Sequence, residues 1–359
     1  MEIRGAPRAP LKFKIMKQEI SIYDIAEMTG VSPSTVSNVI NGRDDKVSAK
    51  TKTKVQDCLE KTGYRTNMVA RNLVTGKSML IGVCLPLLEL GAKQSDLLEN
   101  NPFYHEFIDG VHRVLLENGY ECIVRGMDDN FKYLKWIQSR SLDGLIDLGN
   151  LSDSLNEQLS KLKVPTVLVD NYNSWNTQCD VVLGNDLNGA YMAAKYLLEA
   201  GHRKIAFVCN KIELAGVDAE RYKGYKKALE EYGVKEEFVY KTFLNYQCGL
   251  EIGYKVVDEN APVTAIMCTA DITALGVMHG IEKRGKSVPA DYSIIGYDDI
   301  RALRYVESRL TTVRQKIFDK GCICAQILLD KMNNPETHVS KKTVIEPELI
   351  IRNSTRSIR

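Results

Sequence analysis

The hydrophobic residues that follow residue 20 recur with the spacing of short amphipathic helices. Ile22, Ile25 and Ala26 lie at positions i, i+3 and i+4, so they would share one face of a helix that Gly30 ends. A second helix is predicted directly afterwards, with Ser32 as its N-cap, and a third helix follows another serine N-cap. The apolar faces of these three helices would form one small core.

The second predicted helix has two different faces. Its inward positions are taken by Val36, Val39 and Ile40, and the outward positions carry small polar side chains, at Ser34, Ser37, Asn38 and Asn41. Two short helices joined by a tight glycine turn, with a third to support them, are typical of a helix-turn-helix that reads DNA. Such a motif places the polar face of its second helix in the major groove.

From residue 79 onward the pattern changes to strands that alternate with helices. Apolar runs of strand length lie at 80–85, 122–124, 145–148, 164–169, 205–208, 264–268 and 293–295. Amphipathic segments of helical length separate them, at 104–118, 187–200, 220–232, 271–284 and 318–332. This alternation predicts βαβ units with parallel strands, and a region of this length would form two sheets. The fold class is therefore α/β behind an all-α head, with a ligand expected at the carboxyl ends of strands.

Composition supports a globular chain with an uneven charge. The chain has 359 residues, of which 44% are hydrophobic and 26% charged, as in ordinary globular proteins. Residues 1–78 carry 14 Lys and Arg against 8 Asp and Glu, a net charge of +6 that leaves −4 for the rest. A basic head on a mildly acidic body suits nucleic-acid binding. Because membrane-spanning and signal segments are not evident, we expect a cytoplasmic protein whose nine cysteines are reduced.

Signals of catalysis are weak. Gly76, Lys77 and Ser78 resemble the end of a phosphate-binding loop, but Arg71 stands where that loop requires a glycine. The chain has no GxGxxG, GxSxG or HExxH motif, and its five histidines have no metal-ligand spacing. We therefore expect no enzyme activity, no cofactor and no metal site.

Longer segments resemble one protein family. SIYDIAEMTGVSPSTVSNVIN (21–41), GYRTNMVARNL (63–73) and GKSMLIGV (76–83) are similar to the DNA-binding head and hinge of the lactose-repressor family of bacterial transcription regulators. NPFY (101–104), VLVDN (167–171), GHRKIAFV (201–208), RYKGYKKAL (221–229), TADITALGVM (269–278), IIGYDD (294–299) and LTTVRQ (310–315) resemble the family's periplasmic-binding-protein-like core. The resemblance implies a dimeric repressor, commonly of carbohydrate-utilisation genes, that binds a small effector between two lobes.

The resemblance also implies a domain organisation. We expect a disordered basic arm (1–17), a helix-turn-helix head (18–64), a hinge helix with its linker (65–78) and a core (79–359). Three crossings would join the lobes of the core, with 79–180 and 313–344 in the N-lobe and 181–312 and 345–359 in the C-lobe. An effector that is a nucleoside, a purine or another non-sugar stays open, as does a solute-binding protein without a DNA function.

The head supplies the candidate DNA contacts. Ser34 and Asn38 are expected to read bases, while phosphates would be contacted by Ser21, Ser32, Thr35, Asn41 and Ser48. The family usually carries an arginine where this chain has Asn38, and asparagine pairs with adenine rather than guanine. In the hinge, Thr66 replaces the usual proline, and the minor groove would be entered by Asn67, Ala70 and Leu73. No apolar heptads follow the core pattern, so a homodimer on an inverted repeat of double-stranded operator DNA is expected.

Three charged residues are the main candidates for holding the effector. Asp170 and Asp298 each end a predicted strand, and Arg221 opens a helix, where a cation opposes the helix dipole unless an anionic or polar group faces it. A turn-capping aspartate is the plainer interpretation of Asp170. Further candidates are Phe103, Tyr104 and Tyr246, which would stack on a sugar or base ring or belong to the core, and Asp271, which would otherwise cap its own helix. Ala270 stands where the family has an asparagine, which removes one expected contact.

Overall fold

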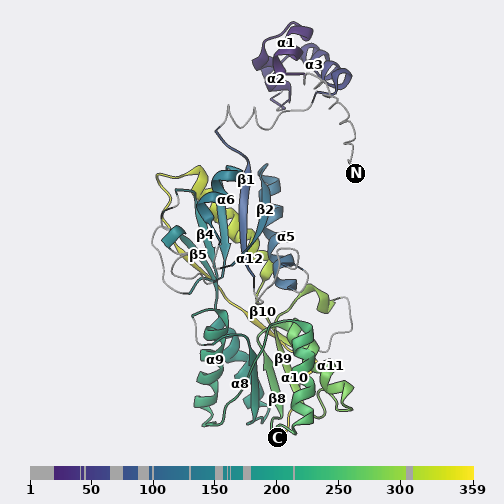
Figure 1. Ribbon diagram of the computed structural model, residues 1–359, viewed down its shortest axis with the longest axis vertical. Helices are drawn as coiled ribbons and strands as arrows, with labels where there is room; N and C mark the ends of the chain where they lie inside the picture. Colours follow the sequence, from purple (N-terminus) through teal and green to yellow (C-terminus); the bar gives the residue numbers. More distant parts are fainter. Residues whose placement is uncertain are drawn as a thin grey trace, which may run out of the picture. The chain divides into compact units, whose positions relative to one another are not determined.

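The computed structural model divides into two units, Met1–Gly76 and Lys77–Arg359. It describes residues 20–40, 42–43, 46–64, 76–87, 97–98, 101–128, 131–149, 157–159, 161, 163–172, 179–212, 215–304 and 310–359 (Figure 1). The predicted arm and most of the predicted hinge lie outside the described residues, as do Asn41, Thr66, Asn67, Ala70 and Leu73. None of the described helices is long and apolar enough to cross a membrane.

The first unit is the predicted three-helix head. It consists of α1 (Ile22–Thr29), α2 (Pro33–Ile40) and α3 (Ala49–Thr62). Ser21 and Asp24 form a capping box at the start of α1, and Gly30 ends that helix with a φ of 62° that glycine adopts without strain. The helices pack around five buried side chains, those of Ile25, Ala26, Val36, Val39 and Val55. The helix-turn-helix prediction is confirmed.

The N-lobe of the second unit contains a six-stranded parallel sheet. Its strands are β1 (Leu80–Pro86), β2 (Glu121–Met127), β3 (Gly144–Leu148), β4 (Thr166–Val169), β5 (Asp180–Gly184) and β11 (Lys342–Ile345), in the order β11-β5-β4-β3-β1-β2. The helices α5 (Pro102–Glu117) and α12 (Ile317–Asn333) pack on one face and α6 (Tyr133–Arg140) on the other. All-parallel sheets are covered on both faces in this way because both faces are apolar.

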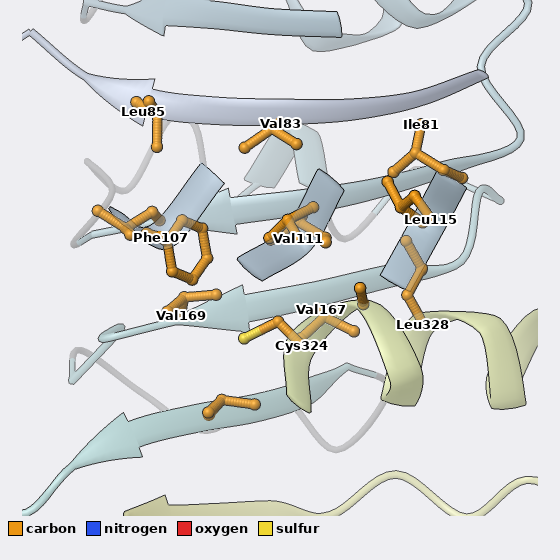
Figure 2. Close-up of a cluster of buried hydrophobic side chains, with 14 of the residues drawn as sticks. Ile81, Val83, Leu85, Phe107, Val111, Leu115, Val167, Val169, Cys324 and Leu328 are labelled. Atoms are coloured by element: carbon orange, nitrogen blue, oxygen red, sulfur yellow. The ribbon is translucent and has the colours of Figure 1, made fainter. Parts of the chain in front are cut away.

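The core under α5 and α12 is the largest buried cluster of the N-lobe. Phe107, Val111 and Leu115 project from α5 and meet side chains of the sheet and of α12, among them Ile81, Val83, Leu85, Val167, Val169, Cys324 and Leu328 (Figure 2). The two helices approach closely because Gly110 faces Gly321. A Cβ added to Gly110 would overlap the carbonyl oxygen of Phe318.

The C-lobe repeats this architecture. Its strands are β6 (Ile205–Cys209), β7 (Phe238–Lys241), β8 (Ala265–Cys268), β9 (Ser293–Asp298), β10 (Thr311–Arg314) and β12 (Glu348–Ile350), in the order β12-β10-β9-β8-β6-β7. Only the pairing of β12 with β10 is antiparallel. On one face pack α8 (Asp186–Glu199) and α9 (Val217–Glu231), and on the other α10 (Tyr246–Asp258) and α11 (Asp271–Lys283) (Figure 1). A short 3-10 helix, η3 (Arg301–Arg304), follows β9.

The chain crosses between the lobes three times, as expected, but the predicted borders need correction. β5 extends the N-lobe sheet to Gly184, so the first crossing lies at Asn185 and not at residue 180. β10 belongs to the C-lobe sheet through Arg314, which moves the second crossing to Gln315. The third crossing lies between β11 and β12. Each crossing continues directly from a strand, so the apolar pattern of the sequence does not mark where one sheet ends.

Candidate functional site

A cavity of about 330 Å³ lies at the carboxyl ends of both sheets of the core. The N-lobe contributes a mostly apolar wall with Pro86, Pro102, Phe103, Tyr104 and Leu148, to which Asn101 and Asp170 add polar groups. The C-lobe contributes most of the polar and charged lining residues, which are Asn210, Lys211, Asp218, Arg221, Thr269 and Asp298, together with apolar residues such as Val217, Leu244 and Ile272. The cavity is large enough for a small organic ligand, and its two walls differ in chemistry.

Two of the predicted aspartates reach the cavity through an unusual backbone conformation. Asp170, directly after β4, has a φ of 51°, and Asp298, the last residue of β9, has a φ of 119°. Positive φ is uncommon for residues with a side chain and costs conformational energy. Strained residues of this kind cluster at functional sites, and both of these line the cavity.

The carboxylate of Asp170 is fully engaged within the protein. The ammonium of Lys320 donates hydrogen bonds to Asp170 Oδ1 at 3.0 Å and to Oδ2 at 2.9 Å, and it also lies 3.3 Å from Gln315 Oε1. The backbone N–H of Gly184 donates to Asp170 Oδ1. Lys320 is completely buried. The sequence interpretation missed this lysine, although a signal existed: Lys320 lies on the same helical face as the apolar residues Ile317 and Cys324.

Arg221 has the anionic partner that its place near the start of a helix requires. Its Nε donates to Asp186 Oδ1 at 2.8 Å, and its Nη1 donates to the carbonyl oxygen of Thr269 at 2.5 Å. The guanidinium lies 3.8 Å from the ring centroid of Tyr297, a cation–π contact. Burial alone would raise the pKa of Asp186, but Arg221 and Lys320 outweigh burial and lower it. Asp186 was not predicted as part of the site.

Two further carboxylates of the polar wall are less well compensated. Asp298 Oδ1 accepts a hydrogen bond from Gln315 Nε2 at 2.5 Å. Burial raises the pKa of Asp298 to about 7, against the opposing effect of Arg221. Asp218 Oδ2 accepts from the backbone N–H of Asn210 at 2.8 Å, and burial raises the pKa of Asp218 as well. Both side chains border the cavity and can accept hydrogen bonds from a ligand.

The structure brings five of the seven predicted effector residues together and separates two. Phe103, Tyr104, Asp170, Arg221 and Asp298 line the cavity, and the hydroxyl of Tyr104 donates to the carbonyl oxygen of Pro86 at 2.9 Å.

Asp271 and Tyr246 are not among the residues that line the cavity. Asp271 is completely buried, and it accepts hydrogen bonds from Thr312 Oγ1 at 2.6 Å and from the backbone N–H of Ile300 at 3.0 Å. It therefore joins β10 to the segment that follows β9 and does not cap α11, whose N-cap is Ala270 without a side-chain bond. Tyr246 is partly exposed at the start of α10, where its hydroxyl contacts His279.

The candidate DNA contacts of the head cluster at helix N-termini. Ser32 Oγ accepts from the backbone N–H of Thr35 at 3.2 Å, and Ser48 Oγ accepts from that of Thr51 at 3.2 Å. Ser21 is the N-cap of α1. Ser34 is exposed and Asn38 half-buried on α2. Helix N-termini carry partial positive charge and free N–H groups, which suit them to phosphate contacts.

Comparisons with known proteins agree with this architecture. Residues 21–67 match the model of bacterial regulatory proteins of the lacI family, and residues 194–355 match the periplasmic binding protein-like domain. Catabolite control protein A of Priestia megaterium is 34% identical over 344 residues, which cover 94% of this chain and 99% of the relative. The HTH-type transcriptional repressor PurR of Haemophilus influenzae is 31% identical over 350 residues, with coverage of 94% and 99%.

Solved structures give the same result. A LacI family transcriptional regulator from Enterococcus faecium with bound ribose has 29% sequence identity and a TM-score of 0.68, and covers 78% of this chain and 100% of its own. The CelR–cellobiose complex has 25% identity and a TM-score of 0.68, with coverage of 94% and 100%. The lac repressor dimer bound to operator has 23% identity and a TM-score of 0.75, and supports the fold. The chain belongs to the lacI family of DNA-binding transcriptional regulators.

Proposed function

We propose that this chain is a repressor whose DNA binding is controlled by a small polyhydroxylated effector, such as a sugar, in the cavity between its lobes. The observation that carries the proposal is that one cavity combines polar and charged groups, mostly of the C-lobe, with an aromatic surface of the N-lobe. Carboxylates and a guanidinium accept and donate the hydrogen bonds that hydroxyl groups need. The apolar wall with Phe103 offers a surface for the face of a sugar ring.

The comparisons support a sugar without identifying one. Two structural relatives contain ribose and cellobiose. We propose that the genes controlled by this chain serve carbohydrate use, and that the functional form is a homodimer on an inverted repeat. In the head, Ser34 and Asn38 read bases, and Ser21, Ser32, Thr35, Asn41 and Ser48 contact phosphates. Asn38 favours adenine at its position through the N6 and N7 atoms of that base.

The effector acts by changing the relation between the lobes. Gln315, within one crossing, lines the cavity and contacts both Asp298 and Lys320. A ligand that binds one lobe arrangement more tightly than another shifts the population of the two arrangements. The hinge and its residues Asn67, Ala70 and Leu73 would transmit that shift to the head.

Two experiments test this function in sequence. First, binding sites are selected from random DNA with the purified full-length chain and with Asn38→Ala. An inverted repeat whose preferred base changes in the variant supports the proposal, whereas the absence of any selected sequence contradicts the DNA function. Second, operator binding is measured with sugars, nucleosides and amino acids. A sugar should alter operator affinity in the wild type and not in Arg221→Ala, while Arg284→Ala, which removes a surface arginine, keeps the response.

A further inference from the structure

The two buried cations of the site are already paired within the protein. Arg221 lies 2.8 Å from Asp186, and Lys320 lies 2.9 Å from Asp170. All four side chains are at most 5% exposed. Since each cation has its own carboxylate, neither Arg221 nor Lys320 offers an uncompensated positive charge to a ligand.

Two more buried carboxylates border the same cavity without such a partner. Asp218 is 6% exposed and Asp298 is 7% exposed. Within the described part of the chain, no lysine, arginine or histidine nitrogen lies within 4 Å of either carboxylate. Lys211 also lines the cavity, but its side chain is exposed and only its backbone N–H approaches Asp218, at 3.4 Å. The start of α9 offsets part of the charge of Asp218 through the helix dipole, which leaves Asp298 as the least compensated carboxylate.

Uncompensated buried charges are costly, and proteins pair them or bind a cation. Burial makes the charged forms of Asp298 and Asp218 less favourable, and it raises the pKa of both side chains for this reason. Oδ1 of Asp218 and the hydroxyl of Thr269 are buried in the same wall; Thr269 lowers the pKa of Asp218, but neither atom makes a well-formed hydrogen bond. This wall therefore has acceptors without a close cation of their own, because its buried cation, Arg221, is already paired with Asp186.

We propose that the effector carries a positively charged nitrogen, as in an amino sugar, and that this nitrogen pairs with Asp298 while Asp218 accepts a second hydrogen bond. The proposal rests on the function proposed above and narrows its ligand class. The ring of the effector packs on Phe103 and the other apolar residues of the N-lobe wall. A phosphorylated sugar is disfavoured, because its phosphate would meet two carboxylates and no uncompensated buried cation.

The test compares ligands that share a hexose ring and differ in the charge of one substituent. Glucosamine, galactosamine and mannosamine are titrated into the full-length chain by calorimetry, alongside the parent hexoses and the hexose 6-phosphates. An amine should bind more tightly than its parent hexose, and the phosphate should bind most weakly. Asp298→Asn should weaken binding of the amine about tenfold or more and affect the parent hexose far less, because a charge-assisted hydrogen bond is lost. Asp258→Asn, which alters a surface ion pair with Arg284, is the matched control.

The outcomes separate this proposal from the proposed function. A hexose or a phosphate that binds as tightly as the amine overturns the cationic effector and leaves the effector site in place. The cationic effector is overturned as well if Asp298→Asn and Asp218→Asn both bind the amine as the wild type does. If no member of the panel binds while the chain still recognises selected DNA, the amino-sugar class is overturned. If the wild type shows no sequence-specific DNA binding, the proposed function is contradicted instead.

Discussion

The two lobes have the same strand order but use the end of their fourth strand differently. Asp170 follows β4 in the N-lobe, Asp298 ends β9 in the C-lobe, and both have positive φ. In the N-lobe, Lys320 of α12 neutralises the carboxylate. In the C-lobe, Asp298 receives an amide hydrogen bond from Gln315 and forms no ion pair with any residue that the structure describes. The strand topology thus determines where a side chain points, while a residue from a neighbouring helix determines whether that side chain is structural or available to a ligand.

The largest effect is expected from breaking the N-lobe pair. Lys320→Met leaves the carboxylate of Asp170 buried without its cation, so the free energy of unfolding should fall by about 3–5 kcal/mol. The double variant Asp170→Asn with Lys320→Met should recover most of this loss, because no unpaired charge stays behind. Chemical denaturation of the three proteins measures the difference.

The matching change in the C-lobe supplies the control for that experiment. Asp298→Asn removes a carboxylate that has no cation within 4 Å among the described residues, so the protein should lose little stability. If Asp298→Asn destabilises the chain as much as Lys320→Met does, the contrast between the two strand ends is wrong.

The next effect concerns a second buried carboxylate of the N-lobe. Asp147 on β3 lies opposite Cys84 on the neighbouring strand β1. At the corresponding position of the C-lobe sheet, Cys268 lies opposite Val208. Asp147 is 1% exposed, and the hydroxyl of Tyr133 donates to its Oδ2. Burial raises the pKa of Asp147 to about 8, against the opposing hydrogen bond from Tyr133. The folded protein therefore holds a proton at neutral pH that the unfolded chain releases.

This proton makes stability depend on pH. Because the folded pKa is raised, the contribution of Asp147 is present at acidic pH and is lost as the pH rises through about 8. Between the ordinary pKa of 3.8 and the raised value of about 8, the free energy of unfolding falls by up to about 1.4 kcal/mol per pH unit. Asp147→Asn should remove this slope, which is measured by denaturation of both proteins from pH 5 to 9. Parallel curves for wild type and variant would show that Asp147 is ionised in the folded protein.

Glycine contacts between helices give a smaller, steric effect in both lobes. A Cβ on Gly280 of α11 would overlap the carbonyl oxygen of Leu250 on α10, just as one on Gly110 would overlap that of Phe318. Gly280→Ala and Gly110→Ala should each cost about 1–3 kcal/mol, since the helices must move apart. Leu116→Ala, at an exposed position of α5, is the control and should cost far less. Equal stability of all three variants would mean that these helix pairs tolerate separation.

Local patterns predicted the elements of this fold well. Amphipathic spacing and capping residues located the three helices of the head, and the alternation of apolar runs with amphipathic segments indicated two parallel sheets. These properties depend on residues that are close in the sequence. The lobe borders at Asn185 and Gln315 were harder to predict, because the chain crosses to the other lobe directly after a strand and the apolar pattern does not show to which sheet that strand belongs.

The site was predicted only in part, for a related physical reason. Asp170, Arg221 and Asp298 were identified from their places at strand and helix ends, but their partners were not. Lys320 lies 150 residues from Asp170 in the sequence, and Asp186 lies 35 residues from Arg221. Such pairs form through the tertiary fold, so sequence spacing does not indicate them. The same limit explains Asp271, whose hydrogen bonds go to Thr312 of β10 and to the backbone of Ile300 after β9, and not to its own helix.

The smallest expected effect tests whether the two lobes influence one another through their outer surface. Arg301 of η3, in the C-lobe, lies 2.7 Å from Asp109 and 3.9 Å from Glu106, both on α5 of the N-lobe. The side chains of Arg301 and Asp109 are 40% and 50% exposed, so solvent screens their attraction. Arg301→Met and Asp109→Asn, combined in a double-mutant cycle, should give a coupling energy of about 0.2–1 kcal/mol that decreases at high salt. A coupling above about 2 kcal/mol, or one that salt leaves unchanged, would mean that this contact links the lobes as strongly as a buried pair does. Asp298 precedes Arg301 by only three residues in the chain, so a ligand bound at Asp298 would then also affect the contact between the two lobes.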